Sequence, residues 1–458
     1  MKIEAQPAAV LAWNRSLAFE DLPGEVVLQA KRCLLDLIGV AAAGVRTPSA
    51  AIAGGIAQAQ MAAGPAKPAA RLLLDGTRVS PAGAAYAGAV AIDSFDAHDG
   101  HPLTKGHAGV AVLPALLAYA DAAPQPPSGR ELLTGIVLGY EIATRAGIAL
   151  HATAPDYHTS GAWNALACAA LGARVLGLDD EAAWQALGIA EYHGPRSQMM
   201  RCVDHPTMVK DGSGWGAHAG VSAAYLAQAG FTGAPAITVS SLEVAEIWSD
   251  LGSRWRILEQ YFKPYPVCRW AQPAVEAALR LVRENAGLGA SEIERIEIVS
   301  FHEAVRLATR RPATSDEAQY SLPYPVAAAV VRGQLGGEEL QQSALEDPEI
   351  LRLSESMVLT ESDAHNARFP AERWAEAVFH LKDGRNLASP PCTTRGDPST
   401  PLGDGELQQK YRALAAPLLG PARSAVIEEA VAGLDGEGSS VLLGLLLSAP
   451  EVRVAATA

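Results

Sequence analysis

The 458-residue chain is long enough for two or three domains. Its 49% hydrophobic and 19% charged residues are typical of a globular protein with a large core, not of a disordered chain. The 36 basic and 50 acidic residues give a net charge of −14, which argues against nucleic acid and anionic membrane as partners. Five scattered cysteines without a CxxC pair argue against a disulfide framework or a zinc ribbon.

The first part of the chain has a helical pattern. The opening MKIEAQPAAVLAWNRS lacks the long apolar run of a signal peptide. From about residue 22 to 260, apolar residues recur at three- and four-residue spacing between short joints that carry Gly and Pro, which predicts a compact helical bundle. Gly, Pro or charge interrupts the apolar stretches before about 18 residues, so we expect no membrane span and a soluble, cytoplasmic protein.

The pattern changes near residue 265. The segment IERIEIVSF, within residues 292–301, alternates and is rich in β-branched residues, which predicts a strand. The segment WAEAVFHLKDGRNLAS predicts a second strand, a turn at Asp383 and Gly384, and a return strand. Between them, LPYPVAAAVVRGQL is typical of a buried helix.

These patterns predict a mainly α fold with a smaller α+β lid domain inserted before the C-terminal helices. We expect a helical domain over residues 1–264, the α+β domain over 265–395, and residues 396–458 returning to the helical domain. The segment PPCTTRGDPST is the expected linker.

The segment AIDSFDAHDGHPLTKGHAGVAVLPALLA is the richest in chemistry. A ten-residue window should hold about 0.2 histidines when 11 are spread over the chain, yet the window 98–107 holds His98, His101 and His107. Asp93 and Asp96, three residues apart at the end of a helix, share a face. This segment has three interpretations: a solvated polar loop, a divalent metal site, or an acid–base site in which histidines lie beside carboxylates.

Two other segments each give only weak evidence of a functional site when taken alone. His158 precedes Thr159 and Ser160, which are good N-cap residues, and a helix start suits a carboxylate. Lys210 lies at the entrance to a helix rich in Ala and Gly. Each also has an ordinary structural interpretation, an exposed His beside a capped helix and a solvated Lys.

Two further segments contain proline. Lys263 lies in the stretch YFKPYPVCRW, where prolines restrict the backbone, with Cys268 and Arg269 close behind. Cys268 is more typical of a small buried hydrophobe than of a nucleophile. Tyr324 in QYSLPYPVAAAVVRG is an acid candidate, although core packing explains it as well.

Together these segments resemble the MmgE/PrpD family over nearly the whole chain. The strings KGHAGVAVLPALLA, GYEIATR, MVKDGSGWGAHAGVSAAYLAQAGFTG, FKPYPVCRW and YSLPYPVAAAV carry the resemblance through their order and spacing. The family's fold is a helical domain plus an α+β lid domain in a homodimer, with the active site in the cleft between domains. The resemblance also implies that no metal and no organic cofactor is used.

The resemblance implies roles for individual residues. The catalytic candidates are His107, His158, Lys210, Lys263 and an acidic residue that is Asp93, with Asp96 as the alternative. His98 stands where one family member has threonine, and Cys268 where the same member has histidine. The implied substrate-binding residues are Asp96, His98, Cys268, Arg269 and Tyr324.

The expected activity is proton abstraction next to a carboxylate of a small polycarboxylic acid, by a dehydratase-type lyase. His107 and His158 are the expected base and acid, and lysines would stabilise the developing negative charge. Epimerisation of a dicarboxylate such as iminodisuccinate and decarboxylation of a cis-aconitate-like acid are alternatives within the family. A non-enzymatic helical scaffold, and a metal-dependent hydrolase that uses His98, Asp99 and His101, are rivals from other classes.

Overall fold

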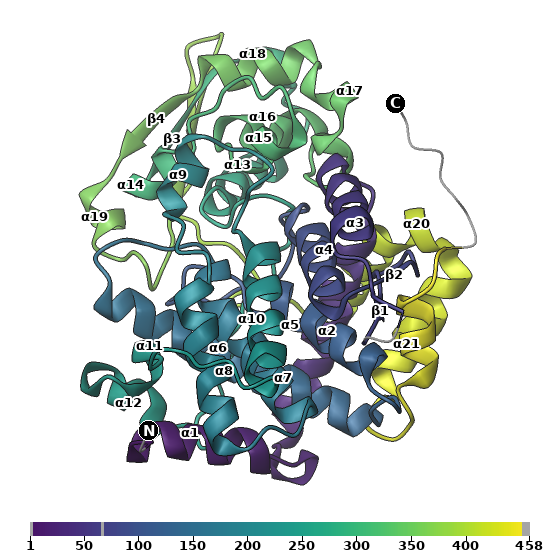
Figure 1. Ribbon diagram of the computed structural model, residues 1–458. Coiled ribbons are helices and arrows are strands. Elements are labelled where there is room, and N and C mark those ends of the chain that lie inside the picture. The colour runs from purple at the N-terminus through teal and green to yellow at the C-terminus, as the bar shows by residue number, and fades with distance from the viewer. Residues whose placement is uncertain (1–2, 66–67, 451–458) are drawn as a thin grey trace.

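The computed structural model describes residues 3–65 and 68–450, and most of them form helices (Figure 1). The predicted fold class, mainly α with a smaller α+β part, is confirmed. The larger helical body contains α1 (Ala5–Ser16), α2 (Gly24–Gly44), α3 (Pro48–Gln60), α4 (Pro81–Asp93), α5 (Gly109–Ala122), α6 (Gly129–Thr153), α7 (Gly161–Val175), α8 (Asp180–His193), α9 (Met199–Asp204), α10 (Ser213–Gln228), α11 (Ile237–Ser240) and α12 (Ala245–Ser249). A two-stranded antiparallel ribbon, β1 (Ala70–Arg71) with β2 (Arg78–Val79), borders it.

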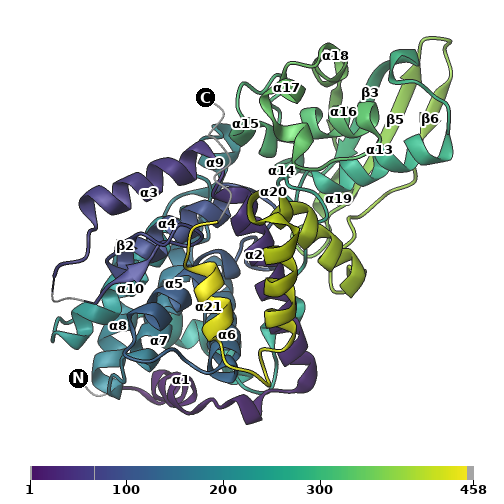
Figure 2. The ribbon, with the colours of Figure 1, turned by 90° about the vertical axis from the view of Figure 1, so that its right-hand side faces the viewer.

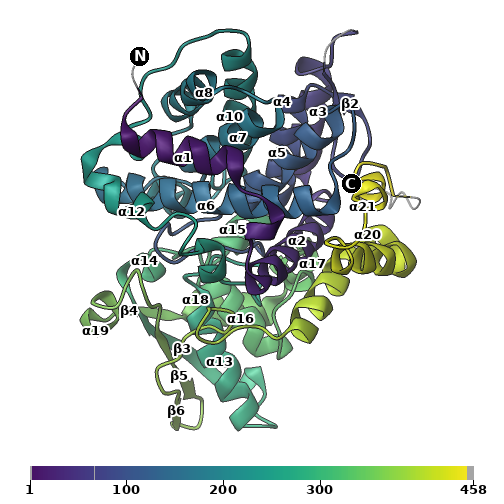
Figure 3. The ribbon, with the colours of Figure 1, turned by 90° about the horizontal axis from the view of Figure 1, so that it is seen from below.

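Helix α6 runs through this body (Figure 3). Ser128 and Glu131 start it with a capping box, in which each side chain accepts a hydrogen bond from the other residue's backbone N–H, at 3.2 and 2.7 Å. The helix is long and apolar enough to cross a membrane, but 94% of its most apolar window is buried inside the protein. We therefore interpret it as a core helix.

Glycines bring helices α7 and α10 into close contact. A Cβ atom on Gly216 would lie 2.4 Å from the carbonyl oxygen of Gly161, and one on Gly220 would lie 2.3 Å from that of Ala165. Real Cβ atoms do not come so near, so only glycine allows this approach. The contact places the start of α10, and the residues just before it, beside the start of α7.

The α+β part lies at one end of the molecule (Figures 1 and 2). Its sheet has the order β4-β3-β5-β6, with β3 parallel to β4 and antiparallel to β5. The helices and strands are α13 (Gln272–Glu284), β3 (Ile293–Ser300), α14 (His302–Val305), α15 (Ser315–Gln319), α16 (Pro323–Arg332), α17 (Gln342–Leu345), α18 (Pro348–Ser356), β4 (Val358–Glu361), α19 (Asp363–Asn366), β5 (Ala375–Leu381) and β6 (Asn386–Ala388). The predicted strands correspond to β3, β5 and β6, and Gly384 takes a left-handed φ of 89° in the predicted turn.

Strand β4 was not predicted from the sequence. It has four residues, of which three are exposed, so it lacks the alternation that a half-buried strand shows. The predicted buried helix is α16.

The C-terminal helices are α20 (Asp404–Ala432) and α21 (Ser440–Leu446). Helix α20 packs along α2 of the helical body (Figure 2). It bends at Gly420, whose φ is 72°, between Pro417 and Pro421. Single 3-10 turns join other segments: η1 (Phe19–Asp21), η2 (Leu242–Val244), η3 (Arg256–Glu259), η4 (Ala290–Glu292) and η5 (Glu338–Leu340).

Candidate active site

The histidine-rich loop between α4 and α5 is buried. His98 is 1% exposed, Asp99 is fully buried and His107 is 7% exposed. Backbone hydrogen bonds of 3.1 and 2.7 Å join Gly100 to Tyr261 and hold the loop in place. The solvated-loop interpretation of this segment is therefore wrong.

Asp96 forms an ion pair with Lys263, and both side chains are almost completely buried. Burial alone would favour the neutral acid. The Lys263 ammonium group, with smaller effects from the nearby histidines, instead holds the pKa of Asp96 well below its usual range. Lys263 therefore lies beside a fixed negative charge.

His98 lies between the two carboxylates at the end of α4. Its Nε2 is 3.7 Å from an oxygen of Asp93 and 3.7 Å from one of Asp96. Neither ring nitrogen has a hydrogen-bond partner among the described residues. Burial, with the charge of Lys263 nearby, lowers the pKa of His98 to about 3. His98 is therefore a neutral imidazole with unused polar atoms.

His107 is held by three hydrogen bonds. Its Nδ1–H donates to the carbonyl oxygen of Asp99, its backbone N–H to Oγ of Ser160 at 3.0 Å, and its carbonyl accepts from Asn164 at 2.9 Å. No described residue hydrogen-bonds Nε2. Burial and the neighbouring His98 lower the pKa of His107 to about 3, and the two rings meet edge to face with centroids 4.2 Å apart. His107 thus has the tautomer and protonation state of a general base.

Lys210 and Asp211 enter from the turn before α10. Lys210 takes a positive φ of 45°, which is uncommon for a residue with a side chain, and its Nζ donates to Gln319 at 2.9 Å. It also lies 3.2 Å from Asp316 and over the ring of Tyr320. These contacts fix a buried cation beside α15.

Two buried carboxyl groups are shifted toward the protonated form. Burial raises the pKa of Asp93 to about 6, although the backbone N–H of Ser213 donates to it at 3.3 Å. Burial also raises the pKa of Asp211, whose oxygens accept hydrogen bonds from Ser160 and, at 3.3 Å, from Tyr320. Both carboxyl groups therefore hold a proton more readily than an exposed aspartate does, which suits an acid in proton transfer.

The structure does not bring every predicted residue to this cluster. His158 is buried, but its Nδ1 bonds the carbonyl of Asp156 at 2.8 Å, and no contact with the cluster is observed among the described residues. The hydroxyl of Tyr324 donates to the carbonyl of Glu339 at 2.7 Å, away from Asp96 and Lys263. Tyr320, four residues earlier, reaches the cluster instead.

The helix start after His158 is also used differently from the prediction. Ser160 is the N-cap of α7 but makes no capping hydrogen bond, because its hydroxyl donates to Asp211. The first N–H of the helix, on Gly161, donates to the carbonyl of Asp211 at 3.0 Å. The predicted carboxylate site at this helix start is therefore wrong.

Cys268 and Arg269 lie beside the cluster. Burial raises the pKa of the Cys268 thiol to about 12, so it remains protonated. Its backbone N–H donates to the carbonyl of Gln319 at 2.8 Å. Arg269 stacks over Tyr261 at 4.6 Å and pairs with Asp397 at 2.9 Å.

Several site residues were missed from the sequence: Ser160, Asp211, Gln319 and Tyr320. The sequence offered one signal for these residues: Asp211 directly follows Lys210, which was a predicted site residue. Gln319 accepts from Lys210 and, at 2.8 Å, from the backbone N–H of Asp96, so it links the two lysine sites. That bridge spans more than 200 residues of chain and leaves no local pattern.

One histidine–carboxylate group has the donors that a metal ion needs. Atoms of Asp96, His98 and His107 lie within 4.8 Å of one another. However, Lys263 already neutralises Asp96, and a second positive charge there would be repelled. The donor set therefore fits a metal poorly.

The hydrolase alternative used His98, Asp99 and His101, and the structure separates these three. Asp99 accepts from the Tyr140 hydroxyl, and His101 pairs with Glu259 at 2.9 Å. Their side chains do not converge with that of His98.

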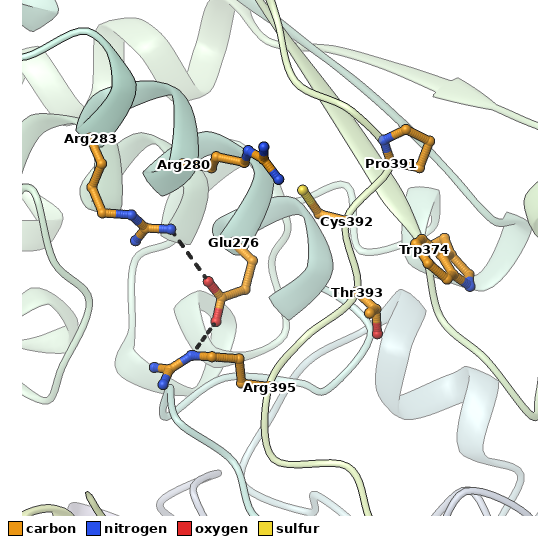
Figure 4. A pocket seen from close by; sticks show the side chains of 8 residues that line it. All are labelled: Glu276, Arg280, Arg283, Trp374, Pro391, Cys392, Thr393 and Arg395. Carbon is orange, nitrogen blue, oxygen red and sulfur yellow. Dashed lines mark ion pairs between the residues drawn. The ribbon is translucent and has the colours of Figure 1, made fainter. Parts of the chain in front are cut away.

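A hollow of about 260 Å³ lies elsewhere, on the α+β part between α13 and residues 391–395 (Figure 4). Glu276 pairs there with Arg395 at 3.5 Å and Arg283 at 4.0 Å, while Arg280 pairs with Glu284 at 2.7 Å. None of the predicted site residues lines it. Its arginines are already compensated, so we do not assign it a role.

Comparisons with known proteins cover both parts of the chain. The family model of the MmgE/PrpD N-terminal domain matches residues 10–248, and that of the MmgE/PrpD C-terminal domain matches residues 265–436. Similar proteins include a cis-aconitate decarboxylase of Aspergillus terreus, 24% identical over 92% of both chains, and one of Homo sapiens, 29% identical over 82% of both. A cis-aconitate decarboxylase of Mus musculus is 27% identical over 75% of this chain and 73% of its own.

Proposed function

The chain belongs to the MmgE/PrpD family, as the resemblance predicted, and on this premise we propose that it is a dehydratase-type lyase. Its substrate would be a small hydroxy di- or tricarboxylic acid, and the reaction would proceed by general acid–base catalysis without a cofactor. The match of both family models over most of the chain supports an enzyme of this kind.

One observation carries the proposal: a neutral base lies beside two buried lysines and a protonatable carboxyl. His107 has its Nδ1–H bound and its Nε2 free, with a pKa of about 3. Lys263 and Lys210 supply positive charge, and Asp93 has a pKa of about 6. Water elimination needs a neutral base and an acid that can carry a proton, and a carboxyl whose pKa is raised toward neutrality is suited to the second role.

The steps follow from these groups. Nε2 of His107 takes the proton from the carbon next to a substrate carboxylate. The lysines stabilise the negative charge that develops on that carboxylate. The C–H electron pair forms the double bond, and the hydroxyl leaves as water with a proton from Asp93 or Asp211. His98 and Tyr320 would line the same space.

Decarboxylation of a cis-aconitate-like acid is the second candidate, because the similar proteins carry that name. In that reaction the C–C bond to one carboxylate breaks and CO₂ leaves. The electron pair is delocalised over the neighbouring double bond, and a carboxyl of the site protonates the carbon. The same lysines and acids would serve both reactions, whereas only elimination needs the free base.

The test is incubation of metal-free enzyme with citrate, 2-methylcitrate and cis-aconitate in deuterated water. Alkene absorbance reports water loss, released CO₂ reports decarboxylation, and NMR reports exchange of the α-proton. We expect alkene formation and exchange with a hydroxy acid. Exchange with inversion and no water loss would identify an epimerase, and no turnover or exchange with any acid would refute the proposal.

Variants connect the activity to the site. His107→Asn should lower kcat by about 10²- to 10⁴-fold, the usual contribution of a positioned general base. The matched control is His302→Asn, since His302 is exposed and its ring pairs with the exposed Glu361. Equal activity in both variants would show that His107 is not the base.

A further inference from the structure

Arg373 is a buried cation that has no anionic partner in the described part of the chain. Its side chain is 5% exposed, and its Nε has no hydrogen-bond partner among the described residues. Within residues 3–65 and 68–450, its side chain forms one hydrogen bond, a long contact of 3.4 Å from Nη2 to the carbonyl of Pro102. The other buried arginines, Arg145, Arg256 and Arg269, each form an ion pair with at least one carboxylate.

The charges around Arg373 do not compensate it. Arg269 lies near it and is itself cationic, although paired with Asp397. Lys105 is close enough that the charge of Arg373 contributes to lowering its pKa, after burial. The nearby carboxylate of Glu303 has the opposite effect on Lys105, and it forms no ion pair with Arg373 among the described residues. Glu259, near His101, already pairs with Arg254 and Arg256. A buried guanidinium group left unpaired is costly, so its retention indicates an anion that binds there.

Arg373 lies next to the catalytic cluster. It stands just before β5 in the α+β part, and its contact with Pro102 reaches the histidine-rich loop of the helical body. Its guanidinium carbon is 5.8 Å from the centre of the Tyr261 ring, and that ring is 6.4 Å from the ring of His107. The guanidinium group of Arg373 and the imidazole ring of His107 are therefore both neighbours of the Tyr261 ring.

We propose that Arg373 binds a substrate carboxylate other than the one at the reacting carbon. This rests on the proposed function, in which Lys210 and Lys263 face the reacting carboxylate. A guanidinium group suits a carboxylate because it can donate two parallel hydrogen bonds. The site then requires a substrate with at least two carboxylates, and the bound substrate contacts both parts of the fold.

The test is direct binding of three unreactive acids by calorimetry: tricarballylate, glutarate, which lacks its central carboxylate, and succinate, which lacks one arm. Arg373→Gln should weaken tricarballylate by about 10- to 100-fold, the usual contribution of charge-assisted hydrogen bonds. One of the two dicarboxylates lacks the carboxylate that Arg373 binds. For that acid, the loss of affinity in Arg373→Gln should be under about threefold. The matched control is Arg368→Gln, because Arg368 is exposed and pairs with Glu372.

A second measurement separates binding from folding. Arg373→Gln removes no ion pair, so the melting temperature without ligand should stay equal or rise, which a structural role would not allow. A large fall in melting temperature, or equal weakening of all three acids, would overturn the assignment. Tight binding of tricarballylate by both the unmodified enzyme and Arg373→Gln would overturn only the role of Arg373. Failure of the unmodified enzyme to bind any of the acids would overturn the proposed function as well.

Discussion

At the scale of single residues, burial sets the chemistry of this site. The same low-dielectric surroundings keep His98 and His107 neutral and raise the pKa values of Asp93, Asp99 and Asp211. Asp96, with the ammonium group of Lys263 beside it, has its pKa lowered instead. Groups only a few residues apart in the loop therefore differ in how readily they bind a proton.

Asp99 permits a test of this effect through stability. Burial raises its pKa to about 7, so between pH 4 and 7 the folded state holds a proton that the unfolded state has lost. This contribution to stability is present below pH 4 and is lost as pH rises to 7, at about 1.4 kcal/mol per pH unit. The asparagine side chain of Asp99→Asn does not titrate. The free energy of unfolding of this variant, relative to that of the unmodified protein, should therefore increase from pH 5 to 7 and then stay constant.

The measurement is urea unfolding of both forms at several pH values. The difference between the two removes the opposite contribution of the buried histidines, which is common to both. Asp383→Asn is the control, because the pKa of this exposed carboxyl lies below its usual range and it does not titrate in that window. A difference that is independent of pH would show that Asp99 is ionised throughout.

At the scale of elements, helix α20 supports the histidine-rich loop between α4 and α5. Lys410 on α20 forms an ion pair of 2.6 Å with the buried Asp36 of α2 and donates at 2.6 Å to the carbonyl of Ala97, next to His98. The helix that follows the α+β part in sequence thus holds the loop between α4 and α5. The sequence predicted the return of these helices but not this contact.

Lys410→Met should destabilise the protein by about 3–5 kcal/mol, because it removes the partner of the buried Asp36 carboxyl. Thermal and urea unfolding would measure this. The matched control is Lys31→Met on α2, whose 2.6 Å pair with Asp435 is partly exposed and should contribute under about 1 kcal/mol. The double change Lys410→Met with Asp36→Leu should recover most of the loss, and failure to recover would mean that the ion pair is not the cause.

At the scale of the whole molecule, the site draws on distant parts of the chain. Its side chains come from the loop between α4 and α5, the start of α7, the turn before α10, the stretch around Lys263 and residues 316–320, with Arg373 proposed as a sixth source. Two buried lysines, Lys210 and Lys263, thereby lie in one site of a chain with a net charge of −14, and each pairs with an aspartate there.

The expected homodimer belongs to this scale. Trp215 and Leu226 on α10 are 54% and 39% exposed and line a hollow of about 470 Å³ with residues of α8. We expect this surface to contact a second copy, so light scattering should give twice the 47.7 kDa chain mass. Trp215→Glu should shift the protein toward monomer, whereas Val441→Glu, at an exposed position on α21, should not. A dimer that survives Trp215→Glu would place the interface elsewhere.

The amino-acid sequence by itself determined the fold class, most strands of the sheet, the family and the segments that supply Asp96, His98, His107, Lys210 and Lys263. Helical periodicity, strand alternation and short motifs are local properties, so they can be read along the chain. Only the tertiary structure decided that Tyr320 and not Tyr324 reaches the site, that Ser160 and Asp211 support His107, and that Arg373 has no anionic partner. Those outcomes depend on which side chains meet across 50 to more than 200 residues of sequence, and on the burial that follows, neither of which a local pattern encodes.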